Sequence, residues 1–565
     1  MPCSLKKVFH YFYRMTFIKK YHFLIFFSAW TLLNFFQAAN TVLLNDEAYY
    51  WVYSNFLDWG YFDHPPMIAL LIKAGYFLFH NEFGVRLFIG LLNTLTLLII
   101  YHLLPRKKEM LFYAIVCSIA LLQLGGFIAV PDIPLIFFVA LFFFVYKKFI
   151  EAASLKNTIL LGLVMSLMLY SKYHSILIII FTLISNPALL IKARAYLAVL
   201  IAIVLFIPHL VWQYQHGFPS VQYHLFERNE ASYNISYTLG YLAGQILLAG
   251  PLMGWLFIWS AFKYKPKDIF QRSLQYCLAG IYIFFLITTY KGRVEANWTV
   301  PAIIPLIILA HQYTADKKKW QRILYYSVPV SLLLITSVRI YLMSDSKPIR
   351  AINTNEFEQN KTWANQIKTF SGELPVVFIN SYQKASKYWF YSGINAFSLN
   401  TPIYRRNNYN FWPIEKSLQG KPVYAISTYD PIFFTDSIKT TAGILRGKRI
   451  DSFFSYSGLQ LKLNGKLGLD PQKKSIVADI SLNDRSKTAW IPDGILGLQI
   501  FQKDQLIKSF DLFTLNTDNI QKTFSVKTSA PALLPPGKYL ARLSISSGIP
   551  NYPSLNSTNL ELVIE

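Results

Sequence analysis

The feature that most constrains this chain is a series of long apolar segments in its N-terminal 344 residues. A membrane-spanning helix needs roughly 17 to 25 mainly apolar residues. Windows of this kind lie near residues 22–39, 84–104, 109–128, 133–149, 157–171, 174–191, 196–212, 237–262, 273–290, 299–314 and 323–342. The chain of 565 residues is 53% hydrophobic and only 15% charged, which excludes a single soluble domain. These segments predict a polytopic α-helical membrane protein with about 11 transmembrane helices.

Basic residues are distributed unevenly over the loops between these segments. They cluster in every second loop, on the side of the basic N-terminus: Arg106, Lys107, Lys108, Lys147, Lys148, Lys192, Arg194, Lys263, Lys265, Lys267, Lys317, Lys318 and Lys319. Because positive charge marks the cytoplasmic side of a membrane protein, the formal net charge of +24 indicates orientation in a membrane and not binding to nucleic acid. The N-terminus is therefore expected in the cytoplasm. An odd number of spans then places the residues after 344 on the opposite, outer face of the membrane.

The N-terminus has basic residues before its first apolar segment, as a signal peptide does. The segment from Phe23 to Ala39 is longer than a usual signal core and lacks a clear cleavage site, which favours an uncleaved first span. Of the three cysteines, Cys117 and Cys277 lie inside apolar segments, so no disulfide framework or thiolate metal site is expected.

A long outer loop, residues 40–83, separates the first two spans. It contains the sequence NDEAYYW at 45–51 and the apolar run PPMIALLIKAGYFLFH at 65–80. That run is short, opens with two prolines and contains Lys73, so it predicts a helix in the membrane interface and not a span. Counting it as a span would reverse the side of every later loop and remove the charge bias. Residues 1–344 are therefore expected to form one transmembrane domain.

The composition changes after Ser344, where charged and small polar residues increase and the apolar runs shorten. LPVVFINS, YQKASKYWFY and PVYAIST predict a strand, a helix and a strand, so residues 345–440 are expected to form a small extracytoplasmic α/β domain. From 441 to 565, apolar and polar residues alternate in runs such as LGLQIF and GKYLARLSIS, separated by turn residues. This pattern predicts an antiparallel extracytoplasmic β-sandwich.

Ionisable residues, which are costly near hydrocarbon, gather in the loops on the outer side. They come from five loops: Asp46, Glu47, Asp63, His64, Asp132, Lys172, His216, His224, Glu227, Arg228, Lys291, Arg293 and Glu295. Acids and bases at one membrane face suit a substrate with a lipid tail and a charged head, such as a lipid-linked phosphosugar. Its departing phosphate needs cations, which Lys172, Arg293 and His64 would supply. An acceptor hydroxyl needs a carboxylate base, for which Asp46 is the leading candidate.

Five motifs in order along the chain resemble the ArnT-like branch of the protein O-mannosyltransferase superfamily, which has the GT-C fold. They are NDEAYYW, GYFDHPPM, VPDIPL, YSKYHS and EANW. The resemblance covers residues 20–345, and SYQKASKYWFYSG and RRNNYNFW also resemble the start of that family's soluble domain. It implies a glycosyltransferase that moves a sugar from a polyprenyl phosphate donor, usually with inversion, to a lipid, glycan or protein acceptor at the periplasmic face.

The resemblance also implies roles for single residues. Asp46 matches the acidic residue assigned as catalytic, with Glu47 beside it. Lys172 matches the lysine near the donor phosphate, and Asp132 matches the acid that helps order the site. Further residues expected to order the site or contact substrate are Asp63, Tyr173, Glu295 and Trp298.

The pair before the two prolines departs from the family. Aminoarabinose transferases carry Glu-Lys there, whereas this chain has Asp63 and His64, so the resemblance does not identify the sugar. His64 would donate to the phosphate when protonated, or Asp63 and His64 would help hold a divalent metal ion. No cofactor is certain, because lone histidines such as His216 and His224 are more often surface residues than metal ligands.

Several of these residues have purely structural alternatives. Asp46 and Glu47 would cap the helix that follows them through its free amide groups. Asp132 would likewise cap a helix, and Lys172 would anchor its segment at the membrane interface.

Two other classes of protein fit a chain with many spans and charged outer loops. A transporter or flippase of lipid-linked sugars would place ionisable groups near the bilayer midplane and often has internal repeats, and neither is evident here. A non-catalytic envelope assembly protein would tolerate loss of Asp46. Arg405 and Arg406 would either reach towards the phosphate or form a solvated surface pair.

Overall fold

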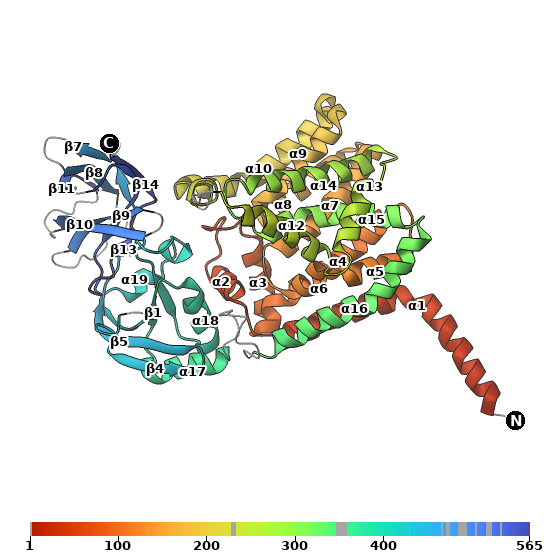
Figure 1. Ribbon diagram of the computed structural model, residues 1–565, viewed down its shortest axis with the longest axis horizontal. Coiled ribbons are helices and arrows are strands. Elements are labelled where there is room, and N and C mark those ends of the chain that lie inside the picture. Colours follow the sequence, from red (N-terminus) through yellow and green to blue (C-terminus); the bar gives the residue numbers. More distant parts are fainter. Residues whose placement is uncertain are drawn as a thin grey trace. The chain divides into compact units, whose positions relative to one another are not determined.

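The chain forms two compact units (Figure 1). The computed structural model describes residues 3–227, 233–345, 359–428, 430–464, 467–470, 475–483, 494–502, 505–515, 523–531 and 534–564. The first unit contains Met1–Val42 and Tyr53–Asp345, and the second contains Leu43–Val52 and Ser346–Glu565. The division after Asp345 lies one residue from the boundary predicted after residue 344. The sequence did not predict that Leu43–Val52 would group with the second unit.

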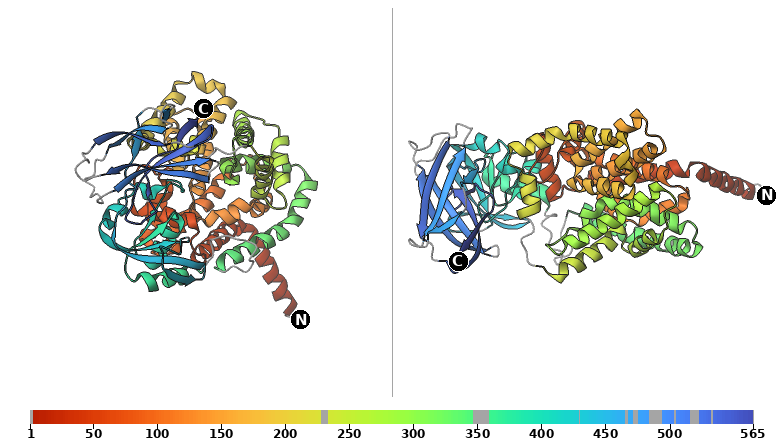
Figure 2. Two further views of the ribbon diagram at one scale, coloured as in Figure 1. Left: turned by 60° about the vertical axis from the view of Figure 1, so that its left-hand side comes forward. Right: turned by 90° about the horizontal axis from the view of Figure 1, so that it is seen from above.

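The first unit is built of helices (Figure 2). Its α-helices are α1 (Cys3–Asn40), α3 (Met67–Leu78), α4 (Glu82–Leu103), α5 (Glu109–Ser118), α6 (Ala120–Leu124), α7 (Asp132–Glu151), α8 (Leu155–Ser171), α9 (Ile176–Ser185), α10 (Ala193–Gln215), α11 (Pro219–Gln222), α12 (Ile235–Ala249), α13 (Gly254–Lys263), α14 (Ile269–Thr288), α15 (Ile303–Thr314) and α16 (Lys318–Met343). Shorter helical turns are η1 (Gly125–Phe127), η2 (Tyr173–Ser175), η3 (Pro187–Ile191), η4 (Tyr223–Glu227) and η5 (Ala296–Ala302). The apolar helix α15 is buried along nearly its whole length and contacts α4, α5, α7, α13 and α14. Helix α2 (Asn45–Asn55) crosses the division between the units.

The polytopic helical architecture is confirmed, but the predicted number of spans is not. Among the described residues, six helices are long and apolar enough to cross a membrane: α1, α4, α7, α10, α14 and α16. Two bent pairs, α5 with α6 and η1, and α12 with α13, raise this number to eight if each pair is one span. The other predicted spans, 157–171, 174–191 and 299–314, are helical but short. The run predicted to lie in the interface forms the short apolar helix α3.

Each bent pair is interrupted by a residue whose backbone conformation is not helical. Helices α5 and α6 meet at 75° around Ile119, whose backbone is extended. Helices α12 and α13 meet at 93° after Gly250, which has a φ of 151° that residues with a side chain rarely adopt. A Cβ at Gly250 would also lie 2.6 Å from the carbonyl oxygen of Ser118. The two breaks therefore touch, and only glycine fits at the contact.

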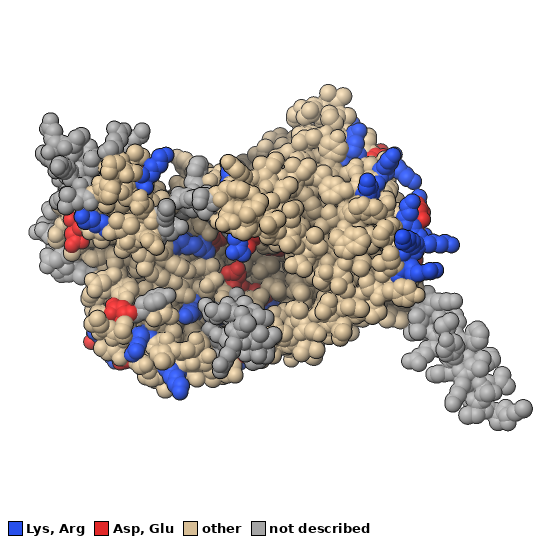
Figure 3. All heavy atoms as spheres, in the orientation of Figure 1, with Lys and Arg blue, Asp and Glu red and all other residues tan. Residues whose placement is uncertain are grey.

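The basic loops of the helical unit gather at one end of it, where Figure 3 shows most of the exposed Lys and Arg side chains of this unit. Two of these loops contact each other directly. Arg106 forms an ion pair with Asp316, and Lys108 Nζ donates to the carbonyl oxygen of Ala315 at 2.5 Å. This clustering agrees with the alternation of basic loops in the sequence, and the cytoplasmic location of this end remains a prediction.

A buried arginine fixes the start of the loop that follows α1. Arg86, on α4, is fully buried, and its guanidinium donates to the carbonyl oxygens of Ala38 at 3.1 Å and Val42 at 2.8 Å. Thr41 accepts a further hydrogen bond from Arg86. These carbonyls lie at and just beyond the C-terminal end of α1, where helix carbonyls lack intrahelical partners and the helix dipole favours a cation. Arg86 therefore anchors the chain at the point where α1 leads into the loop.

The second unit begins with an α/β domain. Its sheet has the order β2-β1-β3-β5-β4, in which β1 pairs in parallel with β2 and β3, and β5 pairs antiparallel with β3 and β4. Its elements are α17 (Asn360–Ser371), β1 (Val376–Ile379), α18 (Tyr382–Ser392), β2 (Ala396–Leu399), η6 (Asn408–Asn410), α19 (Ile414–Leu418), β3 (Lys421–Ser427), β4 (Asp436–Thr440) and β5 (Gly443–Phe453). The boundary predicted after residue 440 falls in the turn between β4 and β5. The α/β sheet thus continues to Phe453.

Two antiparallel sheets follow and face each other across one apolar core. Their strands are β6 (Leu461–Leu463), β7 (Gly468–Asp470), β8 (Ser475–Asn483), β9 (Gly494–Gln502), β10 (Gln505–Leu515), β11 (Thr523–Pro531), β12 (Gly537–Ile545), β13 (Ser554–Leu555) and β14 (Leu560–Ile564). One sheet has the order β10-β9-β12-β13 with β14 on β12, and the other has the order β11-β8-β6 with β7 on β8. Ile480 from one sheet and Leu498 and Leu543 from the other belong to the same buried cluster. The observed sheets therefore form the kind of antiparallel sandwich that the alternating pattern predicts.

Candidate active site

A break between two helices brings Lys172 to the polar part of the helical unit. Helix α8 ends at Ser171, and Lys172 has an extended backbone before the turn η2. Its Nζ lies 2.8 Å from Oδ1 of Asp132, at the start of α7, and Oδ2 of Asp132 accepts from Nδ2 of Asn297 at 3.2 Å. The Lys172 and Asp132 side chains are only 6% and 7% exposed. The structure thus joins two predicted site residues that are 40 positions apart, and the ordering role of Asp132 stays a prediction.

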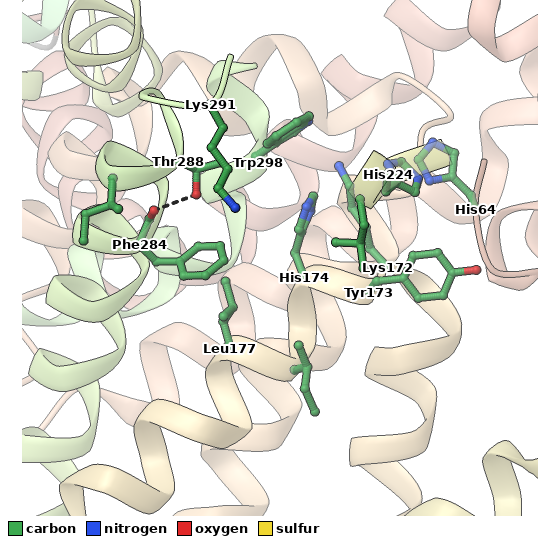
Figure 4. Close-up of a pocket in the computed structure, with 13 residues that line it drawn as sticks. His64, Lys172, Tyr173, His174, Leu177, His224, Phe284, Thr288, Lys291 and Trp298 are labelled. Carbon is green, nitrogen blue, oxygen red and sulfur yellow. Dashed lines mark hydrogen bonds between the residues drawn. The ribbon is translucent and has the colours of Figure 1, made fainter. Parts of the chain in front are cut away.

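A cavity of about 500 Å³ opens beside this ion pair, with walls of two different kinds (Figure 4). The polar wall includes His64, Lys172, Tyr173, His174, His224, Lys291 and Trp298. The apolar wall includes Ile176, Leu177, Leu225, Phe284 and Ile287. An ammonium group has three N–H donors, so Lys172 retains donor capacity beyond its bond to Asp132. A cavity of this kind suits an anionic group attached to a hydrocarbon chain.

Tyr173 points towards a hydrogen-bonded network on the other side of η2. Its hydroxyl donates to Oγ of Ser220 at 3.0 Å, accepts from Nε2 of Gln213 at 3.0 Å, and lies 3.1 Å from Nε2 of His209. Ser220 in turn donates to the carbonyl oxygen of Tyr61. Tyr173 therefore links the Lys172 segment to α10 and, through Ser220, to the loop that contains Tyr61; its predicted role in ordering the site stays a prediction.

The Asp63-His64 pair lies beside the same cavity. His64 lines it, and its ring centroid is 6.4 Å from that of His224. Nε2 of His224 lies 2.9 Å from the backbone oxygen of Asp63. Within the described part of the chain, no three His, Cys, Asp or Glu side chains are placed to hold a metal ion together. A metal site at Asp63 and His64 therefore remains a prediction that lacks a third ligand of these types.

The loop between α14 and η5 divides its charged residues between two locations. Lys291 lines the cavity, whereas the side chain of Arg293 is 75% exposed, and its Nε lies 3.5 Å from Oε1 of Glu295. Trp298 also lines the cavity, and its ring lies 5.5 Å from that of His174. Figure 4 shows Lys291 and His174 entering the cavity from different elements. The sequence drew attention to KGRVEANW but selected Arg293 and passed over Lys291.

Asp46 and Glu47 differ in their surroundings within the second unit. They lie in the first turn of α2; Asp46 is exposed, and Glu47 is fully buried. Oε2 of Glu47 accepts from the backbone N–H of Leu44 at 3.0 Å. A glutamate at the third helical position that bonds back to the residue before the helix forms one half of a capping box. Glu47 therefore has the capping role, and Asp46 presents its carboxylate at the surface.

Aromatic contacts hold this segment within the second unit. Tyr49 Oη accepts from the backbone N–H of Asn408 at 2.8 Å, and the Tyr49 ring lies 4.4 Å from that of Tyr382. Arg405 donates to the Tyr382 hydroxyl at 3.0 Å, and Arg406, which is 7% exposed, lies over the ring of Phe411. Arg405 and Arg406 are therefore packed against aromatic rings, and the predicted alternative of a solvated pair is wrong. Arg228 lies outside the described residues.

Comparisons with known proteins agree with this architecture. A family model described as dolichyl-phosphate-mannose-protein mannosyltransferase matches residues 63–212, a range that includes both Asp132 and Lys172. The crystal structure of ArnT from Cupriavidus metallidurans bound to undecaprenyl phosphate matches with a TM-score of 0.56 and 15% sequence identity. The match covers 76% of this chain and 98% of that chain. This chain has the GT-C fold of that structure.

The chain is also similar to a curated protein, the lipid A galacturonosyltransferase RgtD of Rhizobium johnstonii (strain DSM 114642 / LMG 32736 / 3841). The two are 26% identical over 279 residues, which are 47% of this chain and 59% of the relative. This chain thus spans less than two thirds of the length of that relative. The apo crystal structure of the Cupriavidus ArnT also matches, with a TM-score of 0.56 and 14% identity.

Proposed function

We propose that this chain is a membrane glycosyltransferase that transfers a sugar from a polyprenyl-phosphate donor to a hydroxyl group of an acceptor. The observation that carries the proposal is a cavity that is lined both by Lys172 and Lys291 and by an apolar wall that includes Leu177 and Phe284. The cations would bind the phosphate, and the apolar wall would receive the first part of the prenyl chain. The curated relative acts on lipid A, which favours an envelope lipid over a glycan or a protein as the acceptor.

The proposed reaction is a single displacement with inversion. The acceptor oxygen attacks the anomeric carbon, and the bond from that carbon to the phosphate oxygen breaks. Asp46 takes the proton of the acceptor hydroxyl. The polyprenyl phosphate leaves with its new negative charge stabilised by Lys172, His64 and Lys291, since charge-assisted hydrogen bonds are among the strongest in proteins. Asp132 and Tyr173 hold the lysine segment in position.

We further propose a location for this reaction at the outer face of a bacterial inner membrane. The basic loops would then face the cytoplasm, and the second unit would lie in the periplasm. Cysteine accessibility labelling in intact cells tests this orientation. A cysteine placed in the 264–268 loop should be protected from an impermeant thiol reagent, whereas one placed at the exposed residue Ile432 should react.

The transfer reaction is tested with the full chain in lipid nanodiscs that contain undecaprenyl-phosphate-linked sugars and an envelope lipid acceptor. Mass spectrometry would measure release of undecaprenyl phosphate and the mass increase of the acceptor. Asp46→Asn should lower turnover by roughly 10² to 10⁴, the usual effect of losing a general base. Glu47→Gln should lower turnover less, because Gln retains an oxygen acceptor for the Leu44 N–H. A scaffold or flippase would release no undecaprenyl phosphate with any donor, and that result would reject the proposal.

A further inference from the structure

A second cavity lies on the outer face of the β-sandwich, within the second unit. Residues 496, 498 and 500 of β9 point into the sandwich core, so the alternate residues Ile495, Gly497 and Gln499 point to the opposite face. There they form the floor of a cavity of about 550 Å³ together with Ser509 and Asp511 of β10 and Ser544 of β12. Residues 401–403 and 547–553 form its walls. This volume falls in the range of roughly 300 to 1,000 Å³ that small-molecule sites occupy.

Gln499 gives this cavity a polar group that lacks a protein partner. The residue is 6% exposed, and its Nε2 donates to Oγ of Ser509 at 3.3 Å. Its Oε1 is buried and has no hydrogen-bond partner. A buried amide oxygen without a partner costs roughly 1 to 3 kcal/mol. Because this oxygen is not exposed to the cavity, a ligand hydroxyl would donate to it once the Gln499 side chain turns towards the cavity, and would then supply a hydrogen bond that the protein does not make.

Gly497 keeps the floor of the cavity open. A Cβ at this position would lie 2.9 Å from both Nε2 of Gln499 and Oγ of Ser544. Glycine inside a strand often marks a place where a ligand approaches the backbone closely. Any larger residue at 497 would project from the floor between these two polar side chains.

The walls are held in place by the protein itself. Arg542, next to the floor on β12, donates through Nη1 to the carbonyl oxygens of Pro402 and Tyr404. Oγ of Ser547 donates to the carbonyl oxygen of Tyr552 at 2.7 Å, and the hydroxyl of Tyr552 donates to Oδ2 of Asp430 at 3.2 Å. The Tyr552 ring therefore stands at a fixed position in the wall, where it offers an apolar face.

The chemistry of the lining selects among ligands. Among the described lining residues, Asp511 is the single charged group, and the others are amide, hydroxyl, glycine, proline, tyrosine and aliphatic residues. Anionic ligands would meet a carboxylate and no lining cation. Sugar hydroxyls both donate and accept, as serine hydroxyls do, and the C–H face of a sugar ring suits an aromatic or proline surface. We propose that this second cavity is a binding site that holds a neutral saccharide independently of the sugar-transfer reaction.

The test uses the full chain in amphipol or in a detergent without a sugar head group, because a maltoside detergent would itself compete for this cavity. The labelled protein is applied to immobilised neutral oligosaccharides built from glucose, galactose, mannose or N-acetylglucosamine, with oligogalacturonate and a serine-rich peptide as alternative probes. Dissociation constants for the bound glycans are then measured by saturation-transfer NMR. No polyprenyl donor is present, so the result is independent of transferase activity.

Two variants and a matched control locate the binding. Gly497→Val should abolish saccharide binding, and Gln499→Leu should weaken it by about two- to tenfold, the usual effect of losing a neutral hydrogen bond. Gln502→Leu removes the same side chain from an exposed position of β9 outside the cavity lining and should leave binding unchanged. Thermal unfolding checks that each variant is folded. If Gly497→Val fails to fold, the difference in saccharide affinity between Gln499→Leu and Gln502→Leu shows whether the saccharide binds in this cavity.

Several results would overturn the inference. They are the absence of binding to any neutral glycan, tighter binding of oligogalacturonate or of the peptide than of every neutral glycan, and equal binding by the Gln499→Leu and Gln502→Leu variants. A protein that transfers sugar in nanodiscs but binds no neutral glycan would retain the proposed function and lose this site. The opposite pair of results would retain the site and reject the transferase.

Discussion

The buried ion pair between Lys172 and Asp132 allows a quantitative test of the candidate site. The two charged atoms are 2.8 Å apart, and the side chains are 6% and 7% exposed. Their attraction is about 6 kcal/mol at an effective dielectric constant of about 20, but burying two ions costs several kcal/mol. Removing one partner leaves the other charge buried and unpaired, which typically costs about 3 to 5 kcal/mol.

A double-mutant cycle separates this pairing from the other effects of each substitution. Lys172→Met and Asp132→Asn should each lower the free energy of unfolding by about 3 kcal/mol or more. The double variant should lose less than the sum of the two, with a coupling energy of at least about 2 kcal/mol. Unfolding in mixed detergent micelles, followed by tryptophan fluorescence, provides the measurement. Single-variant losses below about 1 kcal/mol that simply add would show that the two charges are not a buried pair.

The same variants distinguish binding of the donor phosphate from ordering of the site. Lys172→Met removes the cation and should weaken undecaprenyl phosphate binding by about tenfold or more, because hydrogen bonds to charged groups contribute about 1.5 to 3 kcal/mol. Asp132→Asn retains the cation and should change this affinity less while still lowering turnover. Equal loss of affinity in both variants would refute separate roles for the two residues.

Three further predictions follow from other parts of the structure. Lys291→Gln should weaken undecaprenyl phosphate binding several-fold while Arg293→Gln changes it little, because only Lys291 of these two lines the described cavity; a larger effect at Arg293 would contradict this assignment. Gly60→Ala should lower the thermal unfolding temperature, because a Cβ there would lie 2.5 Å from the ring of Trp212. An unchanged temperature would show that the Trp212 ring shifts without loss of stability. Burial raises the pKa of Glu415, so stability from this group is present below its unfolded pKa and is lost as pH rises through the folded pKa. The unfolding free energy of the wild type relative to Glu415→Gln should therefore fall with rising pH, and a rise would refute it.

Several features of the fold could be predicted from the sequence because they depend on local patterns. Apolar segments of membrane-spanning length predicted the helical unit, and period-two alternation predicted the sandwich strands. The number of spans could not be predicted in the same way. Hydropathy does not register the breaks at Ile119 and Gly250, which divide two apolar segments into bent pairs.

The candidate site was predicted in part. Lys172 and Asp132 were selected from separate motifs, and the structure pairs them. Lys291 and Arg293 are two residues apart and chemically similar, so no sequence pattern distinguishes which of them lines the cavity. Their different exposure depends on how the chain turns after α14, which is decided by packing and not by residue type.

The sequence by itself determined which segments are apolar, where the composition becomes more polar and which ionisable residues are available, since these properties are carried by each residue and its near neighbours. Only the tertiary structure decided which charges pair, which glutamate caps a helix and where cavities open. In the sequence Gln499 is an ordinary polar residue of a strand, and it lines a cavity only because β10 and residues 547–553 contribute to the same cavity. Contacts of this kind join distant segments, and their geometry depends on the packing of whole elements and not on any local pattern.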